Sequence, residues 1–340
     1  LEASPGRVRA VLSSGNEISV TGNGLNFAAS GLTSNAGSNK QIRRGSIIRL
    51  AQDIQGNRNI VQMPQIEAAF VSLNPNDGAI KSLIGGFDFT QKKFNHVTQA
   101  WRQPGSSFKP FIYSASLDKN LAPASIINDA PVSFSGQTNG QNWTPKNFDS
   151  KYEGPITMRR GLMKSKNMIS IQILNQIGAQ YGQEFITRFG FDPDKNPPYL
   201  TLALGAGSVT PLQMATAYSV FANGGYKIRP YIISHITDSD GKILSQARPE
   251  KAGDESNRVI DARNAFIMDT LLKDVVRGGT AARANILNRP DLAGKTGTTN
   301  DSIDAWFAGY QPSLVAVAWL GFDQPRNMGG RETGSALALP

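Results

Sequence analysis

The sequence contains no cysteine and only two histidines, His96 and His235. The first absence excludes disulfide bonds, thiolate metal sites and a cysteine nucleophile. The two histidines lie far apart in the chain and show no ligand spacing such as His-x-x-x-His, so we interpret both as structural residues. A zinc hydrolase or a Ser-His-Asp triad is therefore hard to build from this chain.

Long hydrophobic runs and dense basic runs are also missing. No apolar stretch approaches the ~20 residues that cross a membrane, and no signal peptide opens the chain. The charge of +9 comes from 35 basic and 26 acidic residues, without the basic clusters and interleaved aromatic side chains that bind nucleic acid. This charge suits an anionic partner such as a cell-wall polymer or a membrane surface, and it equally fits the ordinary solubilising charge of a protein surface. Because the chain starts without methionine, we expect a fragment of a longer protein.

The remaining composition is that of a globular protein, with 340 residues of which 39% are hydrophobic. Such a chain can bury a sizeable core. Residues 1–62 carry short alternating apolar stretches that are separated by Ser/Asn/Gly-rich segments. This pattern predicts a small β domain, and we place a larger second domain at 63–340.

The second domain carries strand signals at both of its ends. Apolar runs at 68–73 and 79–84 flank the segment Asn-Pro-Asn-Asp-Gly, which predicts a hairpin. Strand-like stretches at 303–310 and 314–322 form a similar pair near the end of the chain. With helices between the two pairs, we predict an α/β domain whose sheet joins its N- and C-terminal parts.

Capping residues mark three of the helices between these strands. Thr157, Thr210 and Asp261 each precede a stretch of helical periodicity, as is typical of N-caps. The pattern further predicts a long irregular segment over 120–152 and a strand over 231–236.

A candidate nucleophile lies where a Pro-Gly turn precedes Ser106. Phe108, Ile112 and Ala115 then recur at helical spacing, which predicts a helix that begins near this serine. Lys109 lies three residues further on the same face, within hydrogen-bond reach of the hydroxyl. Proline follows this lysine, so we expect an irregular or 3₁₀ first turn. A lysine can activate a serine only if burial or a second cation makes its neutral form accessible.

Two later motifs belong with this pair. Ser165-Lys166-Asn167 lies in a predicted interhelical loop, and Lys295-Thr296-Gly297-Thr298 lies on a predicted strand. Each alone is weak, since the first is usually a cap or turn and the second a strand end. In the order Ser-x-x-Lys, Ser-x-Asn, Lys-Thr-Gly, the three resemble the motif set of penicillin-binding proteins and serine β-lactamases.

The resemblance extends beyond the three motifs. Residues 102–110, 204–212, 221–225 and 304–310 look like the transpeptidase domain of class A, bifunctional, 1a-type high-molecular-mass penicillin-binding proteins. It covers roughly 65–340 and implies a central antiparallel sheet flanked by helices. The N-terminal domain loosely resembles the OB-like insertion of these proteins. The family's transmembrane anchor and glycosyltransferase domain have no counterpart in the chain.

The resemblance implies a peptidoglycan D,D-transpeptidase that works through a serine acyl-enzyme and is inhibited by β-lactams. Ser106 would attack the carbonyl between the terminal D-alanines of a stem peptide. Lys109 would be its base, kept neutral by neighbouring Lys295. Ser165 would relay the proton to the leaving amine, and the N–H groups of Ser106 and Thr298 would form the oxyanion hole.

The remaining motif residues are implied in substrate binding. Thr296 and Thr298, with Lys295, suit the substrate's terminal carboxylate, and Asn167 would hold a peptide amide. Gly297 allows close backbone approach on the strand, along which an extended donor peptide could pair. The reaction needs no metal and no organic cofactor.

The implied partners are the stem peptides, as D-Ala-D-Ala donor and amine acceptor, and β-lactam antibiotics. Other cell-wall synthesis proteins would be further partners, and nucleic acid would not. The membrane would be reached only through a missing N-terminal anchor, which places the domain on the periplasmic, extracytoplasmic face of a bacterial inner membrane.

Two alternatives stay open at this point. A serine β-lactamase shares the motifs, but no Glu-x-x-x-Asn pattern follows Ser165 to supply the deacylating glutamate of class A enzymes. A class D-like mechanism, with a modified motif lysine, is not decided by Lys109 alone. The second alternative is a non-catalytic penicillin-sensing module, against which the intact serine and both lysines argue.

Overall fold

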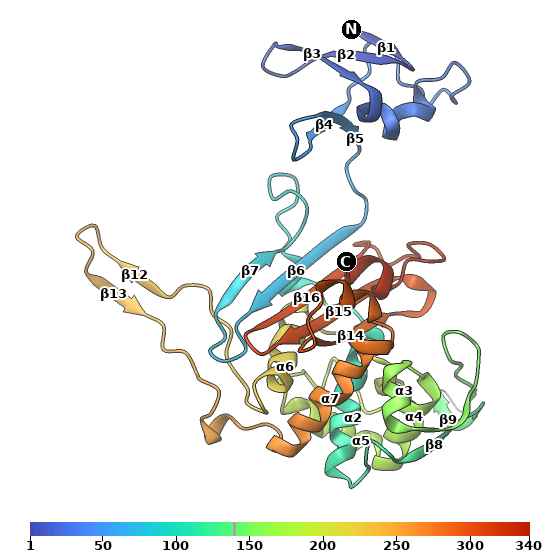
Figure 1. The fold of residues 1–340 in the computed structure, drawn as a ribbon, viewed down its shortest axis with the longest axis vertical. Helices are drawn as coiled ribbons and strands as arrows, with labels where there is room; N and C mark the ends of the chain where they lie inside the picture. Colours follow the sequence, from blue (N-terminus) through green and yellow to red (C-terminus); the bar gives the residue numbers. More distant parts are fainter. Residues whose placement is uncertain (139–140) are drawn as a thin grey trace. The chain divides into compact units, whose positions relative to one another are not determined.

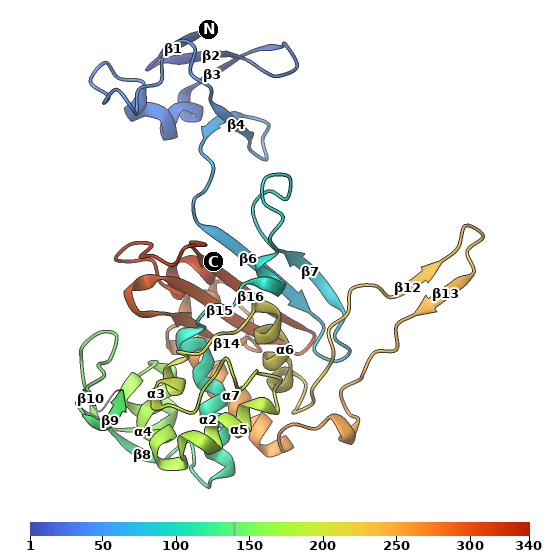
Figure 2. The same cartoon turned by 180° about the vertical axis from the view of Figure 1, so that it is seen from behind.

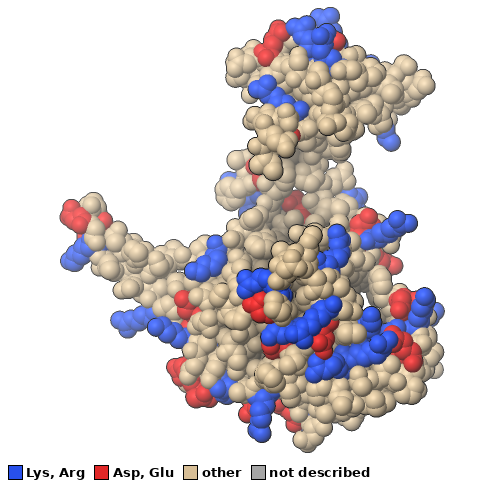
Figure 3. Space-filling model, in the orientation of Figure 1, with Lys and Arg blue, Asp and Glu red and all other residues tan. Residues whose placement is uncertain are grey.

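The computed structural model describes residues 1–138 and 141–340. The chain divides into two compact units, Leu1–Gln65 and Ile66–Pro340, which Figure 1 shows as the blue segment and the remainder. The division lies three residues after the predicted boundary at 62. On the face shown in Figure 3, Lys and Arg side chains lie among Asp and Glu side chains.

The small unit is built from short strands around its own core. The alternating burial of the second and third strands places Val8, Ile18 and Val20 inside, because successive strand side chains point to opposite faces. Leu25, Ala28, Leu32 and Ile60 complete this core. Its elements are β1 (Glu2–Ser4), β2 (Arg7–Val11) and β3 (Glu17–Thr21) in one antiparallel sheet, the 3₁₀ helix η1 (Gly22–Gly31), and the pair β4 (Arg49–Gln52) and β5 (Arg58–Val61). The OB-like identity of this unit stays a prediction.

The larger unit contains the predicted central antiparallel sheet. Its strands lie in the order β14-β15-β16-β6-β7. The pairing of β16 with β6, in which Val315 lies opposite Leu73, joins the C-terminal hairpin to the N-terminal one. The sheet therefore brings the two ends of the domain together, as predicted. The strands are β6 (Glu67–Leu73), β7 (Ile80–Ile84), β14 (Ala293–Thr298), β15 (Asp304–Gln311) and β16 (Leu314–Gly321).

Helices pack to one side of this sheet. Both views show α2 to α7 gathered there (Figures 1 and 2). Helix α2 is buried on nearly all sides, and its Phe111 contacts the rings of Phe189, Phe191, Tyr218 and Phe221. The helices are α1 (His96–Gln99), α2 (Lys109–Asp118), α3 (Met158–Met163), α4 (Asn167–Ile177), α5 (Ala179–Thr187), α6 (Pro211–Ala222) and α7 (Ala262–Gly278).

The predicted caps are confirmed. Thr157 Oγ1 accepts from Arg160 N at the start of α3. Thr210 forms a reciprocal capping box with Gln213 before α6, and Asp261 caps α7. A hydroxyl or carboxylate at this position satisfies a helix N–H that has no partner inside the helix.

Two predictions about the connecting segments are wrong. The segment 120–152 contains strands β8 (Ile126–Asp129), β9 (Phe134–Thr138) and β10 (Gln141–Trp143), of which β8 pairs with β11 (Gly154–Thr157). Residues 139 and 140 of this segment lie outside the described residues. The strand expected over 231–236 is instead β12 (His235–Thr237), which pairs with β13 (Ile243–Gln246). Both errors arise because pairing between strands, and not local composition, decided where each strand begins.

Within the described parts of the chain, no helix is long and apolar enough to span a bilayer. The same parts contain no cluster of three or more acidic or histidine side chains that could hold a metal ion.

Candidate active site

Ser106 lies in a 3₁₀ turn, η2 (Gly105–Phe108), that leads directly into α2. The irregular first turn is as predicted. Gly105 has φ 54°, and a Cβ built on it would lie 2.7 Å from Thr298 O, so the glycine lets this turn pack directly against β14. Ser106 is partly exposed. Ser107 is fully buried, and its Oγ donates to Pro104 O at 2.7 Å. The turn therefore presents Ser106 and hides its neighbour.

A cavity of about 480 Å³ opens beside Ser106. Its walls come from segments that are far apart in the sequence. They are the Ser106 turn, the segment 143–149, the Ser165–Asn167 motif, the segment 201–206, the edge of β14 with 299–300, and Thr280, Thr333 and Ser335. The fold thus places all three motifs around one cavity.

Lys109 is fully buried and uses its ammonium inside this site. Its Nζ donates to Ser165 O at 2.7 Å and to Asn167 Oδ1 at 2.8 Å, with Ser165 Oγ at 3.4 Å. Among the described residues, no hydrogen bond joins it to Ser106 Oγ. The three contacts account for the three N–H groups of a charged lysine.

Lys295, on strand β14, also contacts Ser165. Its Nζ donates to Ser165 Oγ at 2.8 Å and to Thr296 O at 3.0 Å. Ser165 Oγ therefore lies between two ammonium groups. Burial lowers the pKa of Lys295 to about 7. Burial, and then the charge of Lys295, lowers the pKa of Lys109 well below its usual value, against the opposing effect of Asp129. The neutral form of Lys295 is therefore accessible near neutral pH, and the neutral form of Lys109 is favoured by the same burial.

Ser165 has a backbone conformation that favours glycine. It lies in the turn between α3 and α4 with φ 58°. A non-glycine residue in the left-handed region costs roughly 1 to 2 kcal/mol and persists only where its surroundings hold it there. This turn aims the side chain of Ser165 and the side chain of Asn167, the first residue of α4, at the same ammonium.

The strand β14 alternates as predicted. A Cβ on Gly297 would meet Pro104 O at 2.4 Å, whereas Thr296 and Thr298 line the cavity. Because Thr299 N donates to Asp304 O across the pair with β15, alternation along an antiparallel ladder turns Thr298 N away from β15. Thr298 N lies next to Gly105, the first residue of the turn that carries Ser106. Since β14 ends the described sheet, its outer edge lies along the cavity.

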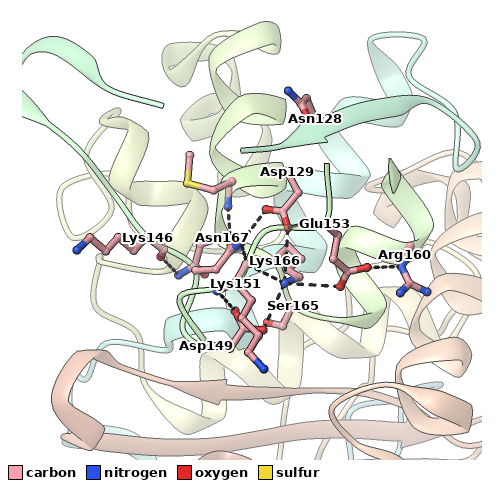
Figure 4. A network of polar contacts seen from close by, with 12 residues as sticks. Asn128, Asp129, Lys146, Asp149, Lys151, Glu153, Arg160, Ser165, Lys166 and Asn167 are labelled. Atoms are coloured by element: carbon pink, nitrogen blue, oxygen red, sulfur yellow. Dashed lines mark hydrogen bonds and ion pairs between the residues drawn. The ribbon is translucent and has the colours of Figure 1, made fainter. Parts of the chain in front are cut away.

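Further polar residues of the site were missed in the sequence. Thr280 Oγ1 lies 2.7 Å from Thr296 Oγ1 on the cavity wall. Asp129 and Lys166 lie in a polar network behind the Ser165–Asn167 motif (Figure 4). Asn147 belongs to the same network, because its Nδ2 donates to Asp129 Oδ1. No local pattern marks Asn147 or Asp129, because their partners lie some 20 residues away in the chain.

A buried ion pair between Arg102 and Asp304 joins two segments that are next to the site. Arg102 Nε donates to Asp304 Oδ1 at 2.7 Å, and Trp319 Nε1 donates to the same oxygen at 2.9 Å. Burial raises the pKa of Asp304, while Arg102 works against that rise. The pair ties the segment before Ser106 to the strand that follows β14.

Residues 68–335 match the family model of the penicillin-binding protein transpeptidase domain. The chain is 48% identical to penicillin-binding protein 1A of Neisseria flavescens over 100% of its own length and 43% of the relative's, and 44% identical to that of Pseudomonas aeruginosa over 87% and 42%. The crystal structure of penicillin-binding protein 1A from Haemophilus influenzae matches with a TM-score of 0.89 and 37% identity, over 98% of this chain and 54% of that one.

The chain thus spans less than half the length of these curated relatives. The predicted resemblance and the predicted fold of the larger unit are confirmed, since the matched region contains all three motifs and the central sheet. The chain belongs to the penicillin-binding protein transpeptidase domain family.

Proposed function

We propose that this domain is a serine D,D-transpeptidase that cross-links peptidoglycan stem peptides. Ser106 Oγ attacks the carbonyl between the two terminal D-alanines, the last D-alanine leaves with a proton, and an acyl-enzyme forms. An amine of a neighbouring strand then attacks that ester, forms the new peptide bond and returns the proton to Ser106. The observation that carries the proposal is the position of Ser165 Oγ, between two buried lysines of lowered pKa and beside the cavity that Ser106 lines.

Lys109 is the proposed base for Ser106. Burial and the charge of Lys295 lower its pKa, which supports a neutral amine at the moment of attack. A neutral amine has two N–H groups and one lone pair, so one of the present contacts must be released. The contact to Ser165 Oγ at 3.4 Å is the longest of the three. Releasing it would leave a lone pair on Lys109 Nζ to take the proton of Ser106. Protonated Lys109 would then donate to Ser165 Oγ again, and Ser165 would pass its own proton to the leaving amine.

The developing negative charge would be held by backbone groups. The N–H groups of Ser106 and Thr298 are the proposed oxyanion hole, which is set before charge develops. Thr296 and Thr298 hydroxyls, with Lys295, would bind the terminal carboxylate. Asn167 would hold a peptide amide of the donor, which could add to the outer edge of β14 as a further strand.

The longer protein is proposed to work at the cell wall. The 1A-type relatives support an extracytoplasmic, periplasmic domain, held at the inner membrane by a segment outside this chain. Stem peptides and β-lactam antibiotics are the proposed ligands, and other cell-wall synthesis proteins are the proposed partners. The small unit, 1–65, is proposed to be an OB-like module of that protein.

The nucleophile is tested by mass spectrometry and peptide mapping after incubation with a penicillin. The parent protein should gain one adduct mass on Ser106. The Ser106→Ala variant should gain none, and the matched Ser107→Ala variant should keep the adduct, because Ser107 faces Pro104 O inside the fold. A full adduct on Ser106→Ala would refute the assignment.

The lifetime of the adduct separates a transpeptidase from a β-lactamase. A transferase must protect its ester from water until an amine arrives. We expect substoichiometric protein to consume one equivalent of penicillin, followed by absorbance, and to retain the mass for minutes. Rapid consumption of the whole drug supply would identify a β-lactamase instead.

A further inference from the structure

The first N–H groups of α4 are capped from a distant segment. Lys166 occupies the N-cap position but its side chain accepts no cap hydrogen bond. Instead Asn147 Oδ1 accepts from Asn167 N at 2.8 Å and from Met168 N at 3.2 Å. A residue some 20 positions away therefore satisfies donors that a local Ser, Thr, Asp or Asn normally satisfies.

The amide of Asn147 has only one orientation that fits its partners. Its Nδ2 donates to Asp129 Oδ1 at 2.7 Å and to Lys151 O at 2.8 Å. Asn147 is 3% exposed and Asp129 is 0% exposed. A rotated amide would place a donor against the helix N–H groups and an acceptor against a carboxylate, so the network holds the oxygen toward α4.

Asp129 is itself held by the turn that it supports. Its Oδ2 accepts from Glu153 N at 2.9 Å and lies 3.5 Å from Lys166 Nζ. Lys166 Nζ also donates to Lys151 O at 3.1 Å and to Asp149 Oδ2 at 3.3 Å (Figure 4). The ammonium group of Lys166, the residue between Ser165 and Asn167, is thus held by partners in this network.

The same segment also holds the side chain of Asn167. Asn167 Nδ2 donates to Lys146 O at 2.9 Å, while its Oδ1 accepts from Lys109 Nζ. Two consecutive residues, Lys146 and Asn147, therefore fix the side chain and the backbone of Asn167. The left-handed Ser165 lies two residues before that fixed point.

We propose that Asn147, oriented by Asp129, is a positioning residue that sets the geometry of Ser165 and Asn167 for proton transfer and donor binding. Among the described residues, the hydrogen bonds of its side chain go to Asp129, Lys151 and the first N–H groups of α4, and none goes to Ser106. Asn147 therefore acts through the backbone of α4. The inference rests on the proposed acylation of Ser106. An unreactive parent protein would overturn that function, whereas a reactive parent with equally reactive variants would overturn only this inference.

The test compares acylation rate constants for a fluorescent penicillin, well below the melting temperature. Asn147→Ala should lose on the order of tenfold to hundredfold, since small displacements of catalytic groups cost that much. Asn128→Ala is the matched control: Asn128 lies next to Asp129 but is exposed on β8 (Figure 4), and this variant should react like the parent. A normal rate for Asn147→Ala, with or without a lower melting temperature, overturns the proposal.

The Asn147→Asp variant supplies a signature that a merely structural role would not produce. It keeps the acceptor toward α4 but places a second carboxylate against Asp129. One proton shared by the two carboxylates restores the missing donor. The rate relative to the parent should therefore rise as the pH falls from about 8 to about 6. Among the described residues, the charged or titratable groups facing this site are Asp129 on β8, Lys166 before α4, and Asp149 and Glu153 of the intervening segment, with Arg160 of α3 on Glu153. Lys109 and Tyr113 of α2 also interact with the charge of Asp129.

A relative rate that is independent of pH in this range would overturn the proposal. If Asn147→Ala lacks the circular-dichroism spectrum of the parent, the isosteric Asn147→Asp variant decides alone by the same criterion.

Discussion

Replacing Lys295 by methionine should stabilise the larger unit near neutral pH while it abolishes acylation. The side chain is fully buried, and its Nζ contacts only Ser165 Oγ and Thr296 O within hydrogen-bond distance among the described residues. Burial without a carboxylate partner lowers the pKa of Lys295 from 10.5 to about 7. Methionine has a similar length and carries no charge, so it can fill the same space.

The size of the effect follows from that pKa. At about 1.36 kcal/mol per pH unit, the fall to about 7 corresponds to roughly 5 kcal/mol of unfavourable burial of the charged form. Two lost hydrogen bonds offset about 1 kcal/mol each, and more if the oxygens are left without donors. The variant should therefore gain roughly 1 to 3 kcal/mol of unfolding free energy at or below about pH 7.

The pH dependence gives the sharper result. Above its folded pKa of about 7, Lys295 is neutral in the native protein, whereas the unfolded chain holds the proton up to about 10.5. Unfolding then takes up a proton, so the free energy of unfolding of the parent rises with pH through this window. The destabilising effect of Lys295 is fully present below about pH 7 and is relieved above it. The variant should lack this contribution, about 1.4 kcal/mol per pH unit.

Urea denaturation followed by tryptophan fluorescence measures the free energy of unfolding of the larger unit alone. All four tryptophans, Trp101, Trp143, Trp306 and Trp319, follow residue 65. Lys81→Met on β7 is the matched control, since Lys81 is exposed, and it should keep the parent's pH dependence. The free energy of unfolding can be plotted against pH between about pH 7 and 9 for the parent and for Lys295→Met. Equal slopes of the two plots would show that Lys295 is not neutral in the folded state, and would refute the reasoning.

Two further substitutions test the support of the site. Gly105→Ala places a Cβ 2.7 Å from Thr298 O at a residue with φ 54°. We expect this variant to lose about 1 to 3 kcal/mol of unfolding free energy and to be acylated more slowly. Gly6→Ala, whose Cβ would meet nothing within 4 Å, should change neither quantity. Asp304→Ala leaves the charge of Arg102 buried without its partner, which should cost about 3 to 5 kcal/mol in urea denaturation. Asp304→Asn keeps an acceptor and should cost less; equal costs would contradict the ion-pair argument.

Local chemistry in the sequence determined much of this protein. The Pro-Gly turn before Ser106, the caps at Thr157 and Thr210 and the alternation along β14 each depend on neighbours within about four residues. Such features were readable because side-chain and backbone preferences act over one turn or one pleat. The structure added that Ser106 is partly exposed and that Ser107 is buried.

The tertiary structure alone decided how the motif residues act together. Strand β8 pairs with β11 some 25 residues away, and only that pairing brings Asp129 to Asn147 and Lys166. The low pKa of Lys109 likewise comes from burial and from the charge of Lys295, 186 positions later in the chain. Desolvation and Coulomb interactions depend on distance in space and not on separation in sequence, so no local pattern could have predicted them.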